Sequence, residues 1–159
     1  MLDGAREGAV AATDEQTEGR GRLGRTWHAP AGSSLLFSIV LEPDVPSERL
    51  PELSLVAGAA VAEALAAQVS VAATVKHPND VLIGGRKVAG VLAEAAEGRV
   101  VLGVGVNVTQ SRDELPVDAD PPATSLLLEG VPADRAELLA SILGRLEARY
   151  DRWVTAAGT

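Results

Sequence analysis

The sequence contains no cysteine, which excludes disulfide bonds and thiolate metal sites and leaves no sign of an oxidising compartment. Basic residues are scarce, because 14 Lys and Arg stand against 22 Asp and Glu and give a net charge of -8. This balance argues against a general binder of nucleic acid or of anionic membranes. No apolar run is long enough to span a bilayer, and the N-terminus MLDGAREGAV lacks the layout of a signal peptide. We therefore expect a cytoplasmic protein in which any anion site is a local concentration of positive charge.

The chain has enough apolar residues for one domain. Its 159 residues, of which 47% are apolar, suffice for a single sizeable core and are too few for a second full domain. Ala and Leu recur at helical spacing in residues 50–69, and residues 133–154 carry the apolar stripe of an amphipathic helix. Runs typical of strands occupy residues 8–13, 34–41, 71–76 and 99–108. The pattern predicts one α+β domain over residues 1–159, with the strand at 34–41 in the centre of the sheet.

A β-hairpin is predicted within residues 76–94, KHPNDVLIGGRKVAGVLAE. The Gly-Gly pair can take positive φ at both positions of a two-residue loop, so the short apolar runs beside it would fold back on each other. Lys76 and Lys87 are then expected on neighbouring strands, close to the turn residues Asn79 and Asp80. Two cations, one amide and one carboxylate on a rigid sheet suit a carboxylate or phosphate ligand.

A long polar loop, DEQTEGRGRLGRTWHAPAGSS, precedes the strand at 34–41 and has almost no apolar anchor before Trp27. Loops of this length in a compact domain are usually functional or disordered. The guanidinium groups of Arg20, Arg22 and Arg25 match phosphate or carboxylate oxygens, and the intervening glycines let the backbone bend around a ligand. A mobile basic surface loop is the alternative, but the hairpin motif that follows favours a lid over a site.

Gly103 and Gly105 interrupt the apolar strand at 99–108, which ends near Asn107. Glycines inside a strand usually mark a bulge or the close approach of another group, so either helix packing or a ligand would explain them. Together with the hairpin and the arginines, this strand would form a site that a carboxylate and a triphosphate can share. Adenylation of a carboxylic acid requires that two anions be brought together, that phosphate charge be neutralised and that water be excluded. Mg²⁺ would accompany ATP.

Three ordered motifs, GRGRLGRTWHAPAG, KHPNDVLIGGRKVAGVLAE and VVLGVGVNV, resemble those of the biotin protein ligase catalytic domain. The resemblance extends from about Gly8 to the C-terminal helix. It implies a mixed β-sheet packed with helices, in a class II synthetase-like fold. The implied activity is ATP-dependent ligation of biotin to a lysine of a biotin carboxyl carrier protein through biotinyl-5'-adenylate. A lipoate or octanoyl ligase of related fold is an alternative, but the pattern GRGR-x-GR-x-W argues against it.

The resemblance also implies roles for individual residues. Lys87 would contact the biotin carboxylate and the adenylate phosphate, with Arg22 as a second catalytic cation. Lys76 and Asp80 would support them by orienting phosphate, metal or the incoming lysine. Trp27 would stack on adenine, the two asparagines would bind its polar edge, and the glycines with Leu92 would wall the biotin slot. The residues expected to bind biotin or nucleotide are Gln16, Arg20, Gly21, Arg22, Trp27, Asn79, Lys87, Gly90, Gly103, Gly105 and Asn107.

Ordinary structural roles are open to the same residues. The lysines are of a type usually exposed on strands, Asn79 and Asp80 suit a turn, Trp27 could anchor its loop, and Asn107 could cap a turn. No protein metal site is expected. His77 stands where the family usually has Trp, and we expect it to be an altered core contact. The three motifs in order favour the functional interpretation.

The sequence also departs from the family pattern at both ends. Only fifteen residues precede Gln16, so the family's Ser-Thr-Asn segment, which lines the biotin pocket, is not found, nor is the small domain expected after the C-terminal helix. We therefore expect an incomplete ligase domain without a repressor role. It would be either an active ligase or an impaired relative that only binds nucleotide or carrier protein. The expected partner is the carrier protein, without nucleic acid or membrane, and a homodimer is a further expectation.

Overall fold

The computed structural model describes residues 4–158. Two helices, α1 (Leu53–Val69) and α2 (Arg135–Ala157), accompany short 3-10 turns η1 (Arg22–Gly24), η2 (Ser47–Glu52) and η3 (Arg112–Glu114). The strands are β1 (Val10–Thr13), β2 (Ser34–Leu41), β3 (Thr74–Lys76), β4 (Asp80–Ile83), β5 (Arg86–Ala96) and β6 (Arg99–Asn107). The α+β class predicted from the sequence is confirmed.

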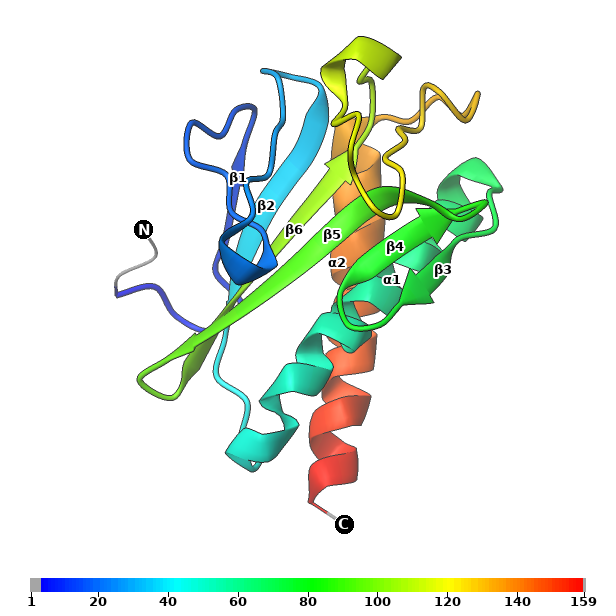
Figure 1. Ribbon diagram of the computed structural model, residues 1–159. Helices are drawn as coiled ribbons and strands as arrows, with labels where there is room; N and C mark the ends of the chain where they lie inside the picture. The colour runs from blue at the N-terminus through cyan, green and yellow to red at the C-terminus, as the bar shows by residue number, and fades with distance from the viewer. Residues whose placement is uncertain (1–3, 159) are drawn as a thin grey trace.

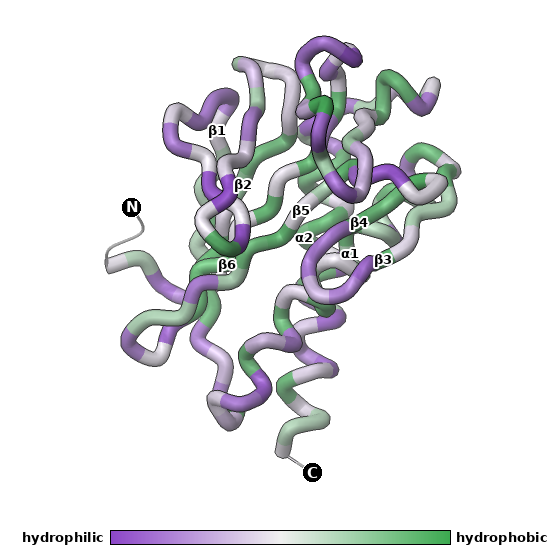
Figure 2. Tube along the Cα trace, viewed as in Figure 1, coloured by the Kyte–Doolittle hydropathy of each residue, from purple (hydrophilic) through white to green (hydrophobic). Residues whose placement is uncertain are grey.

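The six strands form one sheet in the order β1-β2-β6-β5-β4-β3. All neighbouring strands in it pair antiparallel. An isolated parallel bridge between Lys87 and Ala123 makes the pairing of the sheet mixed. Strand β2 has the predicted bounds and lies inside the sheet, between β1 and β6. Figure 2 shows hydrophobic residues concentrated along β2, β5 and β6 and hydrophilic residues in the loops around them.

Two tight turns set the register of the hairpins. Gly84 and Gly85 join β4 to β5 with φ of 55° and 78°, values that suit a two-residue loop between twisted strands. The predicted hairpin is therefore confirmed. Glu97 and Gly98 join β5 to β6 with φ of 54° and 79°. Strand β3 is shorter than the predicted run at 71–76, because residues 71–73 adopt no strand geometry.

The two helices cover one face of the sheet and leave the other face to the loops (Figure 1). Gly58 lets α1 approach closely, since a Cβ there would lie 3.2 Å from Cγ1 of Val75. Asp134 caps α2 by accepting the Glu137 N–H at 2.9 Å. Trp153, near the end of α2, packs into the core and is 8% exposed. The largest fully buried side chains of the core include Leu53, Leu65, Leu102, Leu126, Leu138, Ile142 and Leu146.

The expectation that no apolar segment is long enough to span a bilayer was wrong on length and composition. Within residues 4–158, the 23-residue helical segment Ser47–Val69 meets both requirements. Of its most apolar window, 44% is buried inside the fold, and α1 packs on β3, β4, β5 and α2. Core helices pass the same test, so the segment is only weak support for a membrane span.

Candidate active site

The face of the sheet left open by the helices carries a cleft of about 1120 Å³. Its walls come from the loop at residues 14–33, here called the arginine loop, from β2, β5 and β6, from the turn between β3 and β4, and from residues 116–121. Every site residue predicted from the sequence lines this cleft: Gln16, Arg20, Gly21, Arg22, Trp27, Lys76, Asn79, Asp80, Lys87, Gly90, Gly103, Gly105 and Asn107. The cleft brings together three motifs that are far apart in the chain.

Lys87 forms an ion pair with Asp80 in the wall of this cleft. Its Nζ lies 2.7 Å from Oδ1 of Asp80, and the two side chains are 26% and 16% exposed. A bulge aims Lys87 into the cleft, because residues 80–82 of β4 stand opposite residues 87–90 of β5 and leave Val88 as the extra residue. Strict alternation from Gly90 would have turned Lys87 to the opposite face of the sheet.

The prediction that Lys76 and Lys87 lie on neighbouring strands was wrong. Strand β4 separates β3 from β5, and Lys76 pairs in register with Asp80, which in turn pairs with Gly90. The short sequence between the two lysines contains two turns, so it forms three strands and not two. Lys76 is exposed on the edge strand and lies at the rim of the cleft.

The indole of Trp27 lies on two glycines that face each other across β5 and β6. Gly90 and Gly105 pair in register, and a Cβ added to Gly105 would lie 2.8 Å from Cε2 and Cζ2 of Trp27. A Cβ on Gly90 would lie 3.1 Å from Cζ3 of the same ring. Lys87 Nζ is 5.6 Å from the ring centroid, within cation–π range. The structure thus explains these glycines by the close approach of Trp27, whereas a direct role as the wall of a biotin slot stays a prediction.

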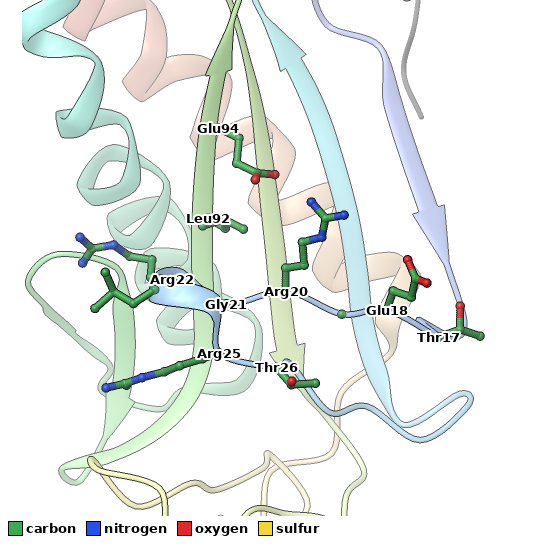
Figure 3. Close-up of a pocket in the computed structure, with 12 residues that line it drawn as sticks. Thr17, Glu18, Arg20, Gly21, Arg22, Arg25, Thr26, Leu92 and Glu94 are labelled. Atoms are coloured by element: carbon green, nitrogen blue, oxygen red, sulfur yellow. The ribbon is translucent and has the colours of Figure 1, made fainter.

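The arginine loop has its own backbone pairing and is less irregular than its composition suggests. The Trp27 N–H donates to Gly19 O at 3.0 Å and the Gly21 N–H to Arg25 O at 2.7 Å. Leu23, at the tip, has a φ of 59° and is 87% exposed. The loop and β5 also enclose a shallower hollow of about 790 Å³, where Arg22 and Arg25 point to one side of the loop and Arg20 to the other (Figure 3).

Both asparagines assigned to adenine are held by internal hydrogen bonds. Asn79 Nδ2 donates to Val91 O at 2.9 Å and pins the turn to β5. Asn107 is 5% exposed; its Nδ2 donates to Thr124 O at 3.0 Å and its Oδ1 accepts Gln110 Nε2 at 3.0 Å. The two side chains therefore shape the cleft wall, and any contact with adenine would have to use their remaining hydrogen-bonding capacity.

The model of the biotin/lipoate A/B protein ligase family matches residues 2–111. The chain belongs to this family.

Relatives within the biotin/lipoate ligase family cover most of this chain. The biotin–acetyl-CoA-carboxylase ligase of Mycobacterium tuberculosis is 46% identical over 152 residues, which are 92% of this chain and 56% of that protein. The bifunctional ligase/repressor BirA of Bacillus spizizenii is 40% identical over 157 residues, 95% of this chain and 48% of that protein. The chain spans about half the length of these curated relatives.

A solved member of the family has the same fold. The biotin protein ligase of Aquifex aeolicus, in complex with biotin and ATP, superposes with a TM-score of 0.82 at 36% identity. The match covers 93% of this chain and 62% of that one. The likeness therefore extends over most of this chain.

Several residues around this family cleft were not predicted from the sequence. Leu36 and Ser38 of β2 line it, together with Asp118 and Asp120 of the opposite rim. The spacing of Leu36 and Ser38 by two, on one strand face, was the available signal. His77 is exposed at the cleft, so the expectation that it is a core contact was wrong.

Within residues 4–158 there is no group of three or more His, Asp or Glu side chains that could hold a metal ion. Asp80, one of the carboxylates that line the cleft, is paired with Lys87. This donor set does not build a protein cage for a cation.

Proposed function

We propose that the chain carries the catalytic site of an enzyme that joins biotin to a lysine of a biotin carboxyl carrier protein, with ATP and through biotinyl-5'-adenylate. The observation that carries the proposal is the convergence of the three motifs on one cleft, with Lys87, Trp27 and the arginine loop around the same space. The solved relative named for its complex with biotin and ATP supports the choice of ligands. The curated relatives named as biotin ligases support the reaction class.

In the first step a biotin carboxylate oxygen would attack the α-phosphorus of ATP, and the bond from that phosphorus to the bridging oxygen would break as pyrophosphate leaves. In the second step the neutral amine of the carrier lysine would attack the acyl carbon, the bond from that carbon to the phosphate oxygen would break as AMP leaves, and the nitrogen would lose a proton. Both steps need charge neutralisation and exclusion of water more than they need an acid or base. The cleft offers these through Lys87 on the sheet and through the exposed arginines of the loop.

The ion pair between Lys87 and Asp80 gives the sheet and the arginine loop different electrostatic roles. Asp80 holds Lys87 at 2.7 Å, which fixes the position of the ammonium but leaves the pair close to neutral. Lys87 would therefore act mainly as an oriented hydrogen-bond donor between the two anions. Most of the net positive charge would come from Arg20, Arg22 and Arg25 of the arginine loop, whose guanidinium groups suit phosphate oxygens.

Magnesium belongs to this proposal as a companion of the nucleotide. Mg²⁺ is commonly bound through substrate phosphates and one or two carboxylates rather than by a protein cage. Asp80, Asp118 and Asp120 are among the carboxylates of the cleft that would be available to the ion. When bound, the ion would help to neutralise the phosphates.

The test is biotin-dependent exchange of labelled pyrophosphate into ATP, with lipoate and octanoate in parallel. We expect exchange with biotin alone. Lys87→Ala should abolish it while the fold persists, whereas Arg99→Ala, which removes a cation paired with Glu42 outside the cleft, should retain most of it. Absence of exchange with biotin would refute the proposed reaction. Exchange with lipoate or octanoate would indicate a lipoate or octanoyl ligase instead.

The carrier protein, the cytoplasmic location and the homodimer belong to the same proposal. The net charge of -8 supports a protein partner over nucleic acid. Transfer of biotin to an isolated carrier domain would test the partner, and light scattering would test the dimer.

A further inference from the structure

A short segment, residues 122–124, takes the place of a strand beside Lys87. Strand β6 accompanies β5 only as far as Ala89, which pairs with Val106. Beyond that point the Lys87 N–H donates to Pro122 O at 2.7 Å, and the Thr124 N–H donates to Lys87 O at 2.8 Å. Both backbone groups of Lys87 are thus held by this segment, here called the strap.

One carboxylate fastens the strap to the base of β5. The Glu129 carboxylate accepts hydrogen bonds from Nε and Nη2 of Arg86 at 2.8 and 2.7 Å, and from the Thr124 hydroxyl at 2.6 Å. The Glu129 side chain is 13% exposed, and Thr124 is fully buried. A two-pronged bond between Arg and a carboxylate fixes orientation as well as distance. Glu129 therefore joins the residue before Lys87 to the last residue of the strap.

The strap also supports the far rim of the cleft. Residues 116–121, which line the cleft opposite the arginine loop, lead directly into Pro122. Asn107 and Arg112 hold the strap from the other side, through Thr124 O at 3.0 Å and Ala123 O at 3.2 Å. A shift of the strap would move Lys87 and this rim together.

We infer that Glu129 is a positioning residue: through Thr124 and Arg86 it holds the strap against β5 and so sets the place of Lys87 and of the rim at residues 116–121. The inference rests on the proposed function for its catalytic consequence, but its geometric part stands on the strap alone. Glu129 itself does not line the cleft, so it acts only through its neighbours. An ordinary ion pair that adds stability and nothing else is the competing explanation.

The test compares Glu129→Gln with Glu52→Gln. Glu52 has a similar set of partners, since it accepts hydrogen bonds from Nε and Nη2 of Arg49 and from the indole N–H of Trp153, and it lies outside the cleft between η2 and α2. Residue-resolved hydrogen exchange measures the amides of Lys87 and Thr124 directly. We expect both amides to exchange on the order of tenfold faster in Glu129→Gln and to stay unchanged in Glu52→Gln.

Pyrophosphate exchange gives the catalytic arm. In Glu129→Gln we expect kcat to fall on the order of tenfold or more, with a smaller change in KM for biotin. The reason is that displacement of Lys87 mainly reduces the stabilisation of the transition state. Thr124→Val, which keeps the pair between Arg86 and Glu129, should give a smaller loss in the same direction. Glu52→Gln should keep kcat within about twofold even if it unfolds at a lower temperature.

Amide hydrogen exchange and pyrophosphate exchange together distinguish failure of this inference from failure of the proposed function. Unchanged protection of the Lys87 and Thr124 amides in Glu129→Gln would overturn the inference, whatever the activity. Faster exchange with unchanged kcat would overturn the positioning role. A wild-type chain without biotin-dependent exchange would refute the proposed function, and the amide measurements would still decide whether Glu129 holds Lys87.

Discussion

Replacing Gly105 by Ala should push the Trp27 indole off the sheet. The added Cβ would lie 2.8 Å from two ring carbons and 3.1 Å from Nε1. Carbon atoms in contact sit about 3.5 to 4.0 Å apart, so the ring has to move by roughly 1 Å or leave. Gly103 is the matched control on the same face of β6, since a Cβ there would meet its nearest atoms, Leu92 O and Ser38 Oγ, at 3.7 Å.

The magnitude follows from two opposing effects. Forcing an extra methyl into a packed place costs about 1 to 3 kcal/mol, whereas Gly to Ala at a compatible position stabilises by about 0.4 to 1 kcal/mol through the unfolded state. Trp27 Nε1 is buried without a hydrogen-bond partner among the described residues, so the ring can leave without breaking a directional bond. We therefore expect Gly105→Ala to lower the unfolding free energy by no more than about 2.5 kcal/mol, and to displace the arginine loop.

Fluorine NMR of chain labelled with 5-fluorotryptophan measures the displacement. The chain has two tryptophans, and Trp153, bonded to Glu52 at 2.6 Å, serves as an internal reference. In Gly105→Ala the Trp27 resonance should shift toward the value of the unfolded chain, while that of Trp153 stays in place. In Gly103→Ala both resonances should stay, and the melting temperature should be unchanged or slightly higher.

A Trp27 resonance that does not move in Gly105→Ala would refute the reasoning, because it would show that the sheet gives way and the ring does not. A shift of the Trp153 resonance would also count against it, since that outcome indicates a change spread through the core. Adenylate formation should fall in Gly105→Ala if the ring position matters for the nucleotide.

Three further predictions follow from contacts in and around the cleft. Asn107→Ala should lower the unfolding free energy by about 1 to 3 kcal/mol for each buried partner left unpaired, such as Thr124 O; urea denaturation would measure it, and an unchanged midpoint would mean that the amide is free to serve a ligand. Residues 18–26 should exchange their amide hydrogens quickly in the free chain and more slowly with biotin and ATP, since the loop is anchored on the sheet mainly through one indole; strong protection without ligand would count against a lid. Arg86, followed by the Thr124 hydroxyl, lowers the pKa of Glu129 below its usual value of 4.5, so the stabilisation is complete above that usual value and disappears as the pH falls through the lowered pKa. The difference in melting temperature between wild type and Glu129→Gln should accordingly be constant above about pH 5.5 and vanish in stronger acid; a difference that persists there would contradict this origin.

The parts of the fold that depend on local signals could be read from the sequence. The Gly-Gly turn, β2 and both helices were predicted close to their observed bounds, because turn chemistry and apolar periodicity are properties of short segments. The predicted site residues line one cleft, which reflects the order of three specific motifs more than any single side chain. Their individual roles stay predictions.

What the sequence could not show depends on contacts between distant segments. The strap at residues 122–124 pairs with Lys87 across more than thirty positions, and its own residues carry no strand pattern. The bulge at Val88 is invisible to a rule of strict alternation. The amide of Asn107 looked available for a ligand because nothing in its neighbourhood of the chain reveals that Thr124 and Gln110 occupy it.

The bulge at Val88 decides the direction of Lys87. Lys87 and Gly90 lie three positions apart and still face the same side of the sheet, because the bulge lets Val88 and Ala89 occupy the place of one residue. Loss of one residue in this interval would remove the bulge, and regular alternation over two positions would leave the ammonium in the cleft. A comparison of related sequences that opens a one-residue gap here would therefore still pair lysines that face the same side of the protein.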